Sequence, residues 1–413
     1  MKKLLTALLA VFSALIFSAT TVQAGQLDVL IDKLVEKGIL SSAEAQIVLD
    51  ETKKEIAKEI AHGKSDASPS WAQKIKLKGD LRLRYQKTHS ETSEAVHKGR
   101  LRYRLGVEAK INEQLKVAAG IASGSSDPRS TNVDFEDSFS SKGIALDLAY
   151  MEYSPYDWMT VVGGKFPRKA YLWQTGDMLW DGDINPEGGS IALTHAINDI
   201  ELFLNAGIWN IDESSSDTSD PFLAYVQPGF KVDLMDGVSL KTALTVYQFN
   251  SLQKTTLDST SGTNTVGGDG SLDFDYDSLN PNVELGFSEP FDGVVPFAAV
   301  FGSYIYNYDE DASDIGNNTG FQAGLKFGDK AIKDKGQWQA KYQYTRLEKD
   351  AFPDAFPDSD RYGGRTDARG HEAIIDYGLA KNVTLSLDYY RTERILAARN
   401  PEHVLQADVV FKF

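Results

Sequence analysis

The sequence of 413 residues predicts an all-β fold: a transmembrane, antiparallel, up-and-down β-barrel of about 16 strands, preceded by a short α-helical segment. Three observations predict it: long segments that alternate between apolar and charged residues, connections that alternate between short and long, and a last segment that ends on an aromatic residue. We expect a signal peptide over residues 1–24, a helical segment over 25–62, a linker over 63–70 and the barrel over 71–413.

Composition excludes several classes of protein. The chain has no cysteine, so disulfide scaffolds, thiolate metal sites and cysteine nucleophiles are excluded. A formal net charge of −16 argues against a nucleic-acid partner, which requires a basic face. A mean hydropathy of −0.32 leaves little room for a bundle of membrane helices. The 18 Tyr, 20 Phe and 6 Trp are too many for a disordered acidic chain.

The N-terminus has the pattern of a secretory signal peptide. A basic start, Met1-Lys2-Lys3, precedes an apolar run from Leu4 to Ile16, and small residues lead to Val22 and Ala24. We expect cleavage after Ala24. The alternative, a membrane-anchoring helix, is disfavoured because the apolar run is short. No later stretch reaches the roughly 18 to 20 apolar residues that a membrane-spanning helix needs.

Residues 27–60 predict two short amphipathic helices. Apolar residues recur at helical spacing from Leu27 to Ile39, Gly38 ends the first helix, and Ser41 or Ser42 caps the second. About 35 residues cannot bury a core alone, so these helices should pack on a partner or on copies of themselves. The alternative is a loosely ordered leader.

Two long segments show strict alternation. Residues 74–85 and 100–111 place apolar residues or glycine at odd positions, with mostly charged residues between them. This period predicts strands with one apolar and one wet face, which a soluble sheet could also provide. Strands in soluble proteins average about five to six residues, whereas a tilted membrane strand needs about 9 to 11. Segments such as 336–345 are of the longer kind, which favours a membrane barrel.

The connections support the same conclusion. Sixteen candidate strands are centred near Leu81, Val107, Val117, Leu148, Val162, Ala192, Phe203, Val226, Leu244, Val283, Val300, Gln322, Ala340, Ile375, Leu387 and Asp408. Seven short connections alternate with eight long ones, which we place at 87–98, 123–142, 167–189, 210–221, 250–271, 307–317, 347–369 and 392–401. Tight turns at one end and long loops at the other are typical of an outer-membrane barrel.

The chain ends on an alternating strand whose apolar face includes Val409, Phe411 and Phe413. A free sheet edge is unstable in lipid, so the last strand should pair with the first and close the barrel. Phe411 and Phe413 resemble the signal that the outer-membrane barrel assembly machinery reads.

Several stretches together resemble the putative-porin family of Gram-negative outer membranes, from about residue 27 to the end. They are residues 34–40, 79–85, 100–105, 147–153, 163–166 and 180–188. The resemblance implies an integral outer-membrane barrel of sixteen strands with a small periplasmic helical segment before the first strand. It also implies passive diffusion of small hydrophilic solutes and ions, and a homotrimer. It does not identify a particular solute.

Charged residues on an alternating strand should face the lumen, because an Arg or Lys on the lipid face near the midplane costs about 2 to 4 kcal/mol. The sequence therefore predicts a pore-lining basic cluster on the first two strands. Its members are Lys76, Lys78, Arg82, Arg84, Arg100, Arg102 and Arg104.

The third long connection, 167–189, is predicted to fold into the lumen, as the loop at that place does in sixteen-stranded porins. Its candidate constriction residues are Trp173, Asp177, Trp180, Asp181, Asp183 and Glu187. We hypothesise that this loop sets an acidic side against the arginine wall, so that a transverse field admits polar solutes and slows apolar ones. The alternative is an ordinary outer loop beside a solvated charged strand.

No catalytic or metal motif stands out, so neither an enzyme nor a cofactor is expected. The six histidines lack ligand spacing, and no G-x-S-x-G or phosphate-binding glycine loop occurs. Residues 181–186 begin like a calcium loop but place Pro186 where glycine is required.

Two alternatives to general or mildly anion-favouring diffusion remain open. One is a solute-selective channel, which aromatic lining would favour for sugars and an unopposed arginine row for anions such as phosphate. The other is a structural tether, in which residues 27–60 contact peptidoglycan or another periplasmic partner. Outer-membrane lipid and lipopolysaccharide are the expected surroundings, and long acidic loops could bridge divalent cations to the latter.

Overall fold

The computed structural model describes residues 74–213 and 220–413. The predicted signal peptide, helical segment and linker over residues 1–70 lie outside the described residues. In the described part of the chain, no helix has the length and hydropathy to cross a membrane.

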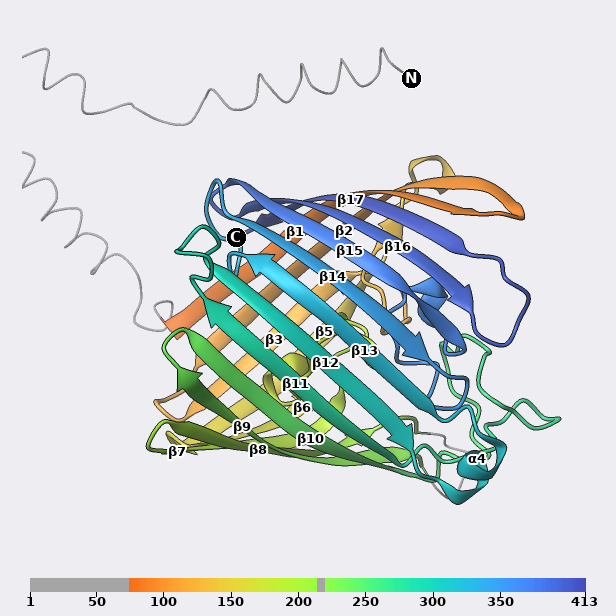
Figure 1. Ribbon diagram of the computed structural model, residues 1–413, viewed down its shortest axis with the longest axis horizontal. Helices are drawn as coiled ribbons and strands as arrows, with labels where there is room; N and C mark the ends of the chain where they lie inside the picture. The colour runs from red at the N-terminus through yellow and green to blue at the C-terminus, as the bar shows by residue number, and fades with distance from the viewer. Residues whose placement is uncertain (1–73, 214–219) are drawn as a thin grey trace, which may run out of the picture. The chain divides into compact units, whose positions relative to one another are not determined.

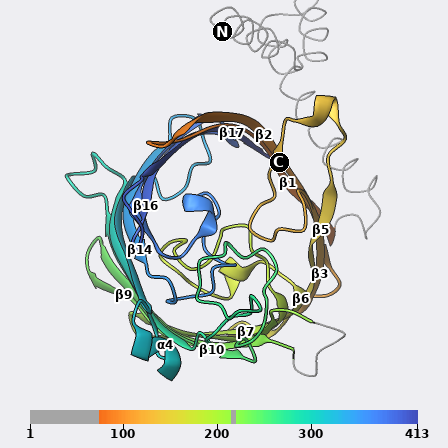
Figure 2. The same ribbon diagram turned by 90° about the vertical axis from the view of Figure 1, so that its right-hand side faces the viewer.

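The described residues form one closed antiparallel sheet (Figures 1 and 2). Its strands are β1 (Ile75–Ser90), β2 (Ser93–Lys110), β3 (Leu115–Ser123), β4 (Val133–Asp134), β5 (Ile144–Tyr156), β6 (Met159–Lys165), β7 (Glu187–Ile197), β8 (Ile200–Asn210), β9 (Phe222–Met235), β10 (Val238–Asn250), β11 (Ser278–Ser288), β12 (Phe297–Asn307), β13 (Thr319–Gly328), β14 (Trp338–Leu347), β15 (Ala368–Ala380), β16 (Val383–Arg394) and β17 (Glu402–Lys412). Within the described residues, four short helices lie in the connections: η2 (Asp137–Phe139), η3 (Arg168–Ala170), α4 (Glu310–Ile315) and η4 (Tyr362–Gly364).

The barrel has sixteen long strands, because β4 is a two-residue strand that pairs with β2 inside a connection. Each predicted strand centre falls within one of the sixteen. The sheet closes where β1 pairs with β17, from Asp80↔Lys412 to Ser90↔Glu402. The prediction of an antiparallel, up-and-down barrel is therefore confirmed.

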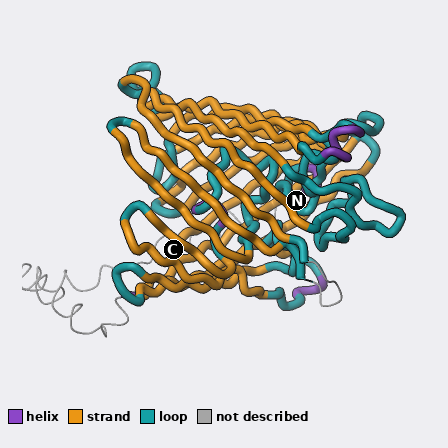
Figure 3. Tube along the Cα trace, turned by 90° about the horizontal axis from the view of Figure 1, so that it is seen from below, coloured by secondary structure: helices purple, strands orange, loops and turns teal. Residues whose placement is uncertain are grey.

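The connections at the two ends differ as expected, with long loops gathered at one end (Figure 3). The prediction for the first long loop, 87–98, is wrong. β1 and β2 continue pairing to Ser90↔Ser93, so the loop is a two-residue turn at the tip of a long hairpin. The tip of this hairpin is exposed to solvent, and its residues are mostly polar. The apolar alternation therefore ends before the strands do, which made the tip resemble a long loop.

The two faces of the sheet carry different residues. Outward-facing side chains such as Leu77, Val300 and Ile375 are 65%, 57% and 56% exposed, as expected for a face that meets lipid. The buried apolar cluster instead joins inward side chains of the wall to the inward loops, and includes Leu172, Trp180, Trp209, Tyr247 and Phe352. Figure 2 shows these loops inside the ring of strands.

Candidate channel constriction

The five arginines of the basic cluster form one patch of inner wall. Across β1 and β2, Arg82 lies opposite Arg102, and Arg84 lies opposite Arg100. Like charges directly opposite one another destabilise a sheet unless something opposes them. Three carboxylates on the barrel strands and in the β4 connection do so, and sequence reasoning missed all three.

Asp80, which lies opposite Arg104, accepts from Arg102 Nη2 at 2.8 Å and from Arg104 Nε at 2.7 Å. Asp408 on β17 receives Nε and Nη2 of Arg84, both at 2.8 Å. Asp134 on β4 accepts from Arg100 Nε at 2.6 Å. The pairing of Arg84 with Asp408 joins the first and last strands, where the barrel closes. The alternation of residues in the sequence shows that a carboxylate points inward, but it does not show the strand register, which decides the arginine that the carboxylate pairs with.

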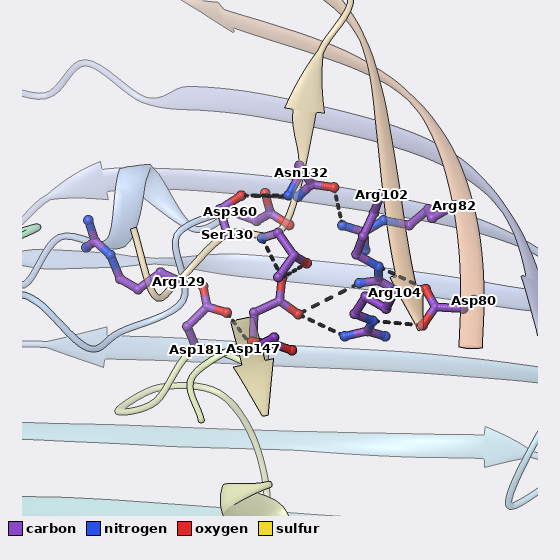
Figure 4. A network of polar contacts seen from close by, with 12 residues as sticks. Asp80, Arg82, Arg102, Arg104, Arg129, Ser130, Asn132, Asp147, Asp181 and Asp360 are labelled. Carbon is purple, nitrogen blue, oxygen red and sulfur yellow. Dashed lines mark hydrogen bonds and ion pairs between the residues drawn. The ribbon is translucent and has the colours of Figure 1, made fainter. Parts of the chain in front are cut away.

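The loop 166–186 brings a fourth carboxylate to this wall, next to the pairs of Asp80 with Arg102 and Arg104 that Figure 4 shows. Asp183 lies 3.4 Å from Arg104 Nη1 and 3.8 Å from Arg102 Nη1. Its second oxygen accepts from the Thr131 hydroxyl at 2.8 Å. Burial alone would raise the pKa of Asp183, but Arg102 and Arg104 hold it below its usual value. The carboxylate therefore docks directly on the arginines, with no open gap between the two charges.

A second loop, 348–367, also enters the lumen, although the sequence predicted only a long outer connection there. Its Asp360 accepts from Arg84 Nη1 at 2.7 Å, and its Phe352 and Arg361 are fully buried. Sequence reasoning missed this loop. The signal that could have shown it is the density of aromatic residues, Asp and Pro in residues 351–360.

The other predicted acidic residues have different neighbours. Asp177 lies near Lys341 Nζ at 3.9 Å and accepts from Gln343 Nε2 at 3.0 Å. Asp181 accepts the backbone N–H groups of Asp183 at 2.8 Å and Ser359 at 2.7 Å, which joins the two inward loops. Burial and the neighbouring Asp183 raise the pKa of Asp181 to about 7.

Glu187 is not a loop residue, because the strand begins three residues earlier than expected. It is the first residue of β7, is exposed, and pairs with Lys165 on β6 at 2.9 Å. Glycines at 188 and 189 suggested a loop, but here they are part of the β6–β7 pairing.

Both predicted tryptophans hold the loop against the wall. The Trp180 ring is 2% exposed; it stacks on Phe356 at 4.9 Å and meets Trp209 edge-on at 5.4 Å. Trp173 packs edge-on against Phe203 of β8, with Lys241 Nζ 4.6 Å from its ring centre. Trp180 is thus covered by protein, whereas Trp173 is half-buried and also lines the lumen cavity.

Lys76 and Lys78 lie near the short-turn end, where both are exposed and Lys78 pairs with Glu108 at 2.8 Å. At the chain end, the backbone of Phe413 exchanges two hydrogen bonds with Gly79, of 2.9 and 3.0 Å. Phe411 lies opposite Leu81 and Val383. The roles assigned to these residues from the sequence stay predictions.

A cavity of about 1120 Å³ continues from the arginine wall into the barrel. Its lining carries both signs of charge, with Arg82 and Arg102 on β1 and β2 and Asp376 and Asp388 on β15 and β16. A second cavity of about 880 Å³ lies at the short-turn end, lined by Lys231, Lys326 and Glu284 among others. Within residues 74–213 and 220–413, no cluster of three or more His, Asp or Glu is arranged to hold a metal ion.

Comparison with known proteins agrees with this architecture. Pseudomonas putida OprB matches with a TM-score of 0.54 at 11% identity, over 85% of this chain and 97% of that one. Salmonella typhi OmpF, solved in complex with daunomycin, matches with a TM-score of 0.50 at 11% identity, over 82% of this chain and 97% of that one. At these identities the likeness shows the fold alone. No curated protein matches the sequence significantly.

A family model described as "Putative porin" matches residues 88–285 and 271–413, which is most of the chain. This match agrees with the closed barrel of sixteen long strands and with its charged lumen. The chain belongs to the putative-porin family.

Proposed function

We propose that this chain is an outer-membrane porin through which small hydrophilic solutes and ions diffuse passively, with the loops 166–186 and 348–367 narrowing the lumen. The observation that carries the proposal is the charged cavity of about 1120 Å³ beside these inward loops in a closed barrel. A lumen lined by charged groups holds water and admits polar solutes.

The charge balance of the wall supports weak ion selectivity. Every arginine of the cluster has a carboxylate oxygen within 4 Å, the longest of these closest contacts being 3.7 Å, from Arg82 to Asp408. An unopposed row of arginines would favour anions, and this row is opposed. Of the two loop tryptophans, Trp180 packs against Trp209, Phe352 and Phe356, which leaves little of its ring for a sugar to stack on. General diffusion therefore fits better than a sugar- or anion-selective channel.

Planar-bilayer recordings with a salt gradient test this function. The refolded protein should conduct with a small reversal potential. The double substitution Arg102→Ala/Arg104→Ala should shift the reversal potential toward cations, since Asp80 and Asp183 lose their counter-charges. Asp183→Asn should shift it toward anions.

A matched control removes two lysines on exposed connections, Lys254→Ala/Lys381→Ala, and should leave selectivity unchanged. Unchanged conductance and selectivity in the arginine double variant would remove the proposed role of the wall. Absence of any conductance in the parent protein would refute the channel itself.

Further partners are proposed with the same function. A homotrimer, surrounding lipopolysaccharide, and recognition of Phe411 and Phe413 by the barrel assembly machinery follow from the resemblance noted in the sequence. A periplasmic or peptidoglycan contact through residues 27–60 has its own test. Deleting residues 27–62 leaves a channel conducting, whereas a chain whose main role is tethering loses that role.

A further inference from the structure

Arg391 on β16 differs from the other arginines in its surroundings. Within residues 74–213 and 220–413 it is the arginine for which no hydrogen bond, ion pair or ring contact is found. The other arginines each have a partner, such as Arg369 with Glu393 at 3.0 Å and Arg399 with Glu393 at 3.4 Å. Arg391 is half-buried on the outer wall, so its partner should be a molecule outside this chain.

The strand register places Arg391 in the middle of a row of histidine and tyrosine residues. His371 of β15 lies opposite Arg391, Arg391 lies opposite His403 of β17, and His403 lies opposite His89 of β1. Tyr344 of β14 extends the row on the other side of His371. Residues directly opposite one another share a face, and adjacent strands lie about 4.8 Å apart. The outer row therefore runs at one level across five neighbouring strands.

The residues below this row show the level at which it lies. The next row toward the barrel middle holds Tyr342, Ala373, Tyr389, Leu405, Lys87 and His97. The row below that is Ala340, Ile375, Leu387, Ala407 and Tyr85, which is the apolar band. None of the three rows contains a carboxylate. The outer row thus lies at the long-loop edge of the apolar band, where lipid headgroups begin.

Three tyrosine–histidine pairs hold the imidazoles in place. The tyrosine Oη lies 2.6 Å from the histidine Nδ1 in Tyr342–His371, Tyr389–His403 and Tyr85–His97. When the hydroxyl donates to Nδ1, the neutral ring carries its proton on Nε2. Each of these rings then presents an N–H donor away from its tyrosine, even without a positive charge.

We propose that four members of this outer row, His371, Arg391, His403 and His89, bind the phosphate of a lipid headgroup in the outer leaflet. A guanidinium binds phosphate through two parallel N–H groups, and flanking imidazole N–H donors complete the contact. A chain of net charge −16 that keeps carboxylates out of these rows is suited to an anionic lipid there. The proposal rests on the membrane orientation of the proposed function.

The test titrates detergent-purified full-length protein with lipid A that carries both phosphates, and counts bound lipid by native mass spectrometry. Arg391→Gln should weaken binding at least tenfold. Arg399→Gln, which removes the same charge from a 73% exposed side chain at the rim, should stay within twofold of the parent. Dephosphorylated lipid A should bind weakly to the parent protein and to both variants. Inorganic phosphate should not compete at equal concentration, which makes the lipid the source of the phosphate.

Equal binding of lipid A by Arg391→Gln and the parent would overturn the proposal, as would equal losses in the two variants. A changed oligomeric state with unchanged lipid binding would assign the row to a second copy instead. Single-channel conductance of Arg391→Gln should match the parent, which separates this site from the channel. If that variant does not fold, His403→Gln is expected to weaken lipid A binding at least threefold.

Discussion

At the scale of single residues, the lumen is organised by ion pairs that join distant parts of the chain. Arg84 is 5% exposed and binds Asp408 of the last strand and Asp360 of an inward loop. Breaking a buried pair is strongly destabilising, because the remaining charges stay buried without a partner. Exposed pairs contribute far less.

Arg84→Gln should therefore lower the free energy of unfolding by about 3–5 kcal/mol, since Asp408 and Asp360 both lose a counter-charge. Lys78→Gln removes a cation from the exposed pair with Glu108 and should cost at most about 1 kcal/mol. Urea unfolding in lipid vesicles, followed by tryptophan fluorescence, measures both. Equal stability of the two variants would contradict this account of the wall.

At the scale of elements, the inward loops are held by one another as well as by the wall. Asp354 of the loop 348–367 accepts from the Thr260 and Thr263 hydroxyls and from backbone N–H groups of the connection 251–277. Asp350 accepts from Thr265 in the same way. The aromatic cluster around Trp180 then joins the loop 166–186 to both the wall and the loop 348–367.

Trp180→Ala should loosen the constriction. Removing a buried tryptophan costs about 3–5 kcal/mol in a packed site, and here that site is the anchor of the loop 166–186. Single-channel records should show a larger and noisier conductance. Trp158→Ala at the turn between β5 and β6, where Trp158 is 49% exposed and stacks on Tyr156, should leave the conductance unchanged.

The docked loops should also respond to pH. Because burial and Asp183 raise the pKa of Asp181 from 3.8 to about 7, the docked loop binds this proton more tightly than the undocked loop. Docking therefore loses stability as the pH rises from about 4 to about 7. The pKa of Asp183 is lowered, so its ion pairs are present throughout this range and are lost only in stronger acid.

Amide exchange over residues 166–186, corrected for intrinsic rates, should thus show more protection at pH 5.5 than at pH 8. Asp181→Asn mimics the protonated carboxyl and should flatten this dependence. A parent protein whose protection rises with pH would have the opposite sign and would rule out Asp181 as the controlling group.

At the scale of the whole molecule, the barrel depends on the closure between its first and last strands. Gly79 and Phe413 exchange backbone hydrogen bonds, and the Phe413 ring covers Gly79 on the outer face. A Cβ at Gly79 would lie 2.5 Å from both the Phe413 ring and the Arg104 carbonyl oxygen. A glycine is therefore required at this position by close approach.

Gly79→Ala should reduce the fraction of chains that close into a barrel, seen as loss of the heat-modifiable folded band in electrophoresis. Gly302→Ala is the matched control on β12, because a Cβ there would lie no closer than 3.6 Å to any neighbour. Equal folding yields for the two variants would show that this contact does not limit closure.

The sequence by itself determined the class of fold and much of its detail. Residues alternate with a period of two in Ile75–Tyr85 and Arg100–Lys110, and this alternation determines which side chains face lipid. The alternation of short and long connections determines the number of strands. Both patterns are local in the sequence, so each strand can be recognised without knowing its neighbours. The boundaries of the first hairpin and of β7 were misjudged because polar or glycine-rich stretches resemble loops.

The tertiary structure alone decided which charges meet. Asp80 and Asp408 neutralise the arginine wall, Asp360 reaches it from a second inward loop, and Arg391 is left without a partner on the outer face. These contacts depend on strand register and on how loops far apart in sequence fold together. The energy of an ion pair depends on distances of a few ångströms between such segments, and no local pattern encodes those distances.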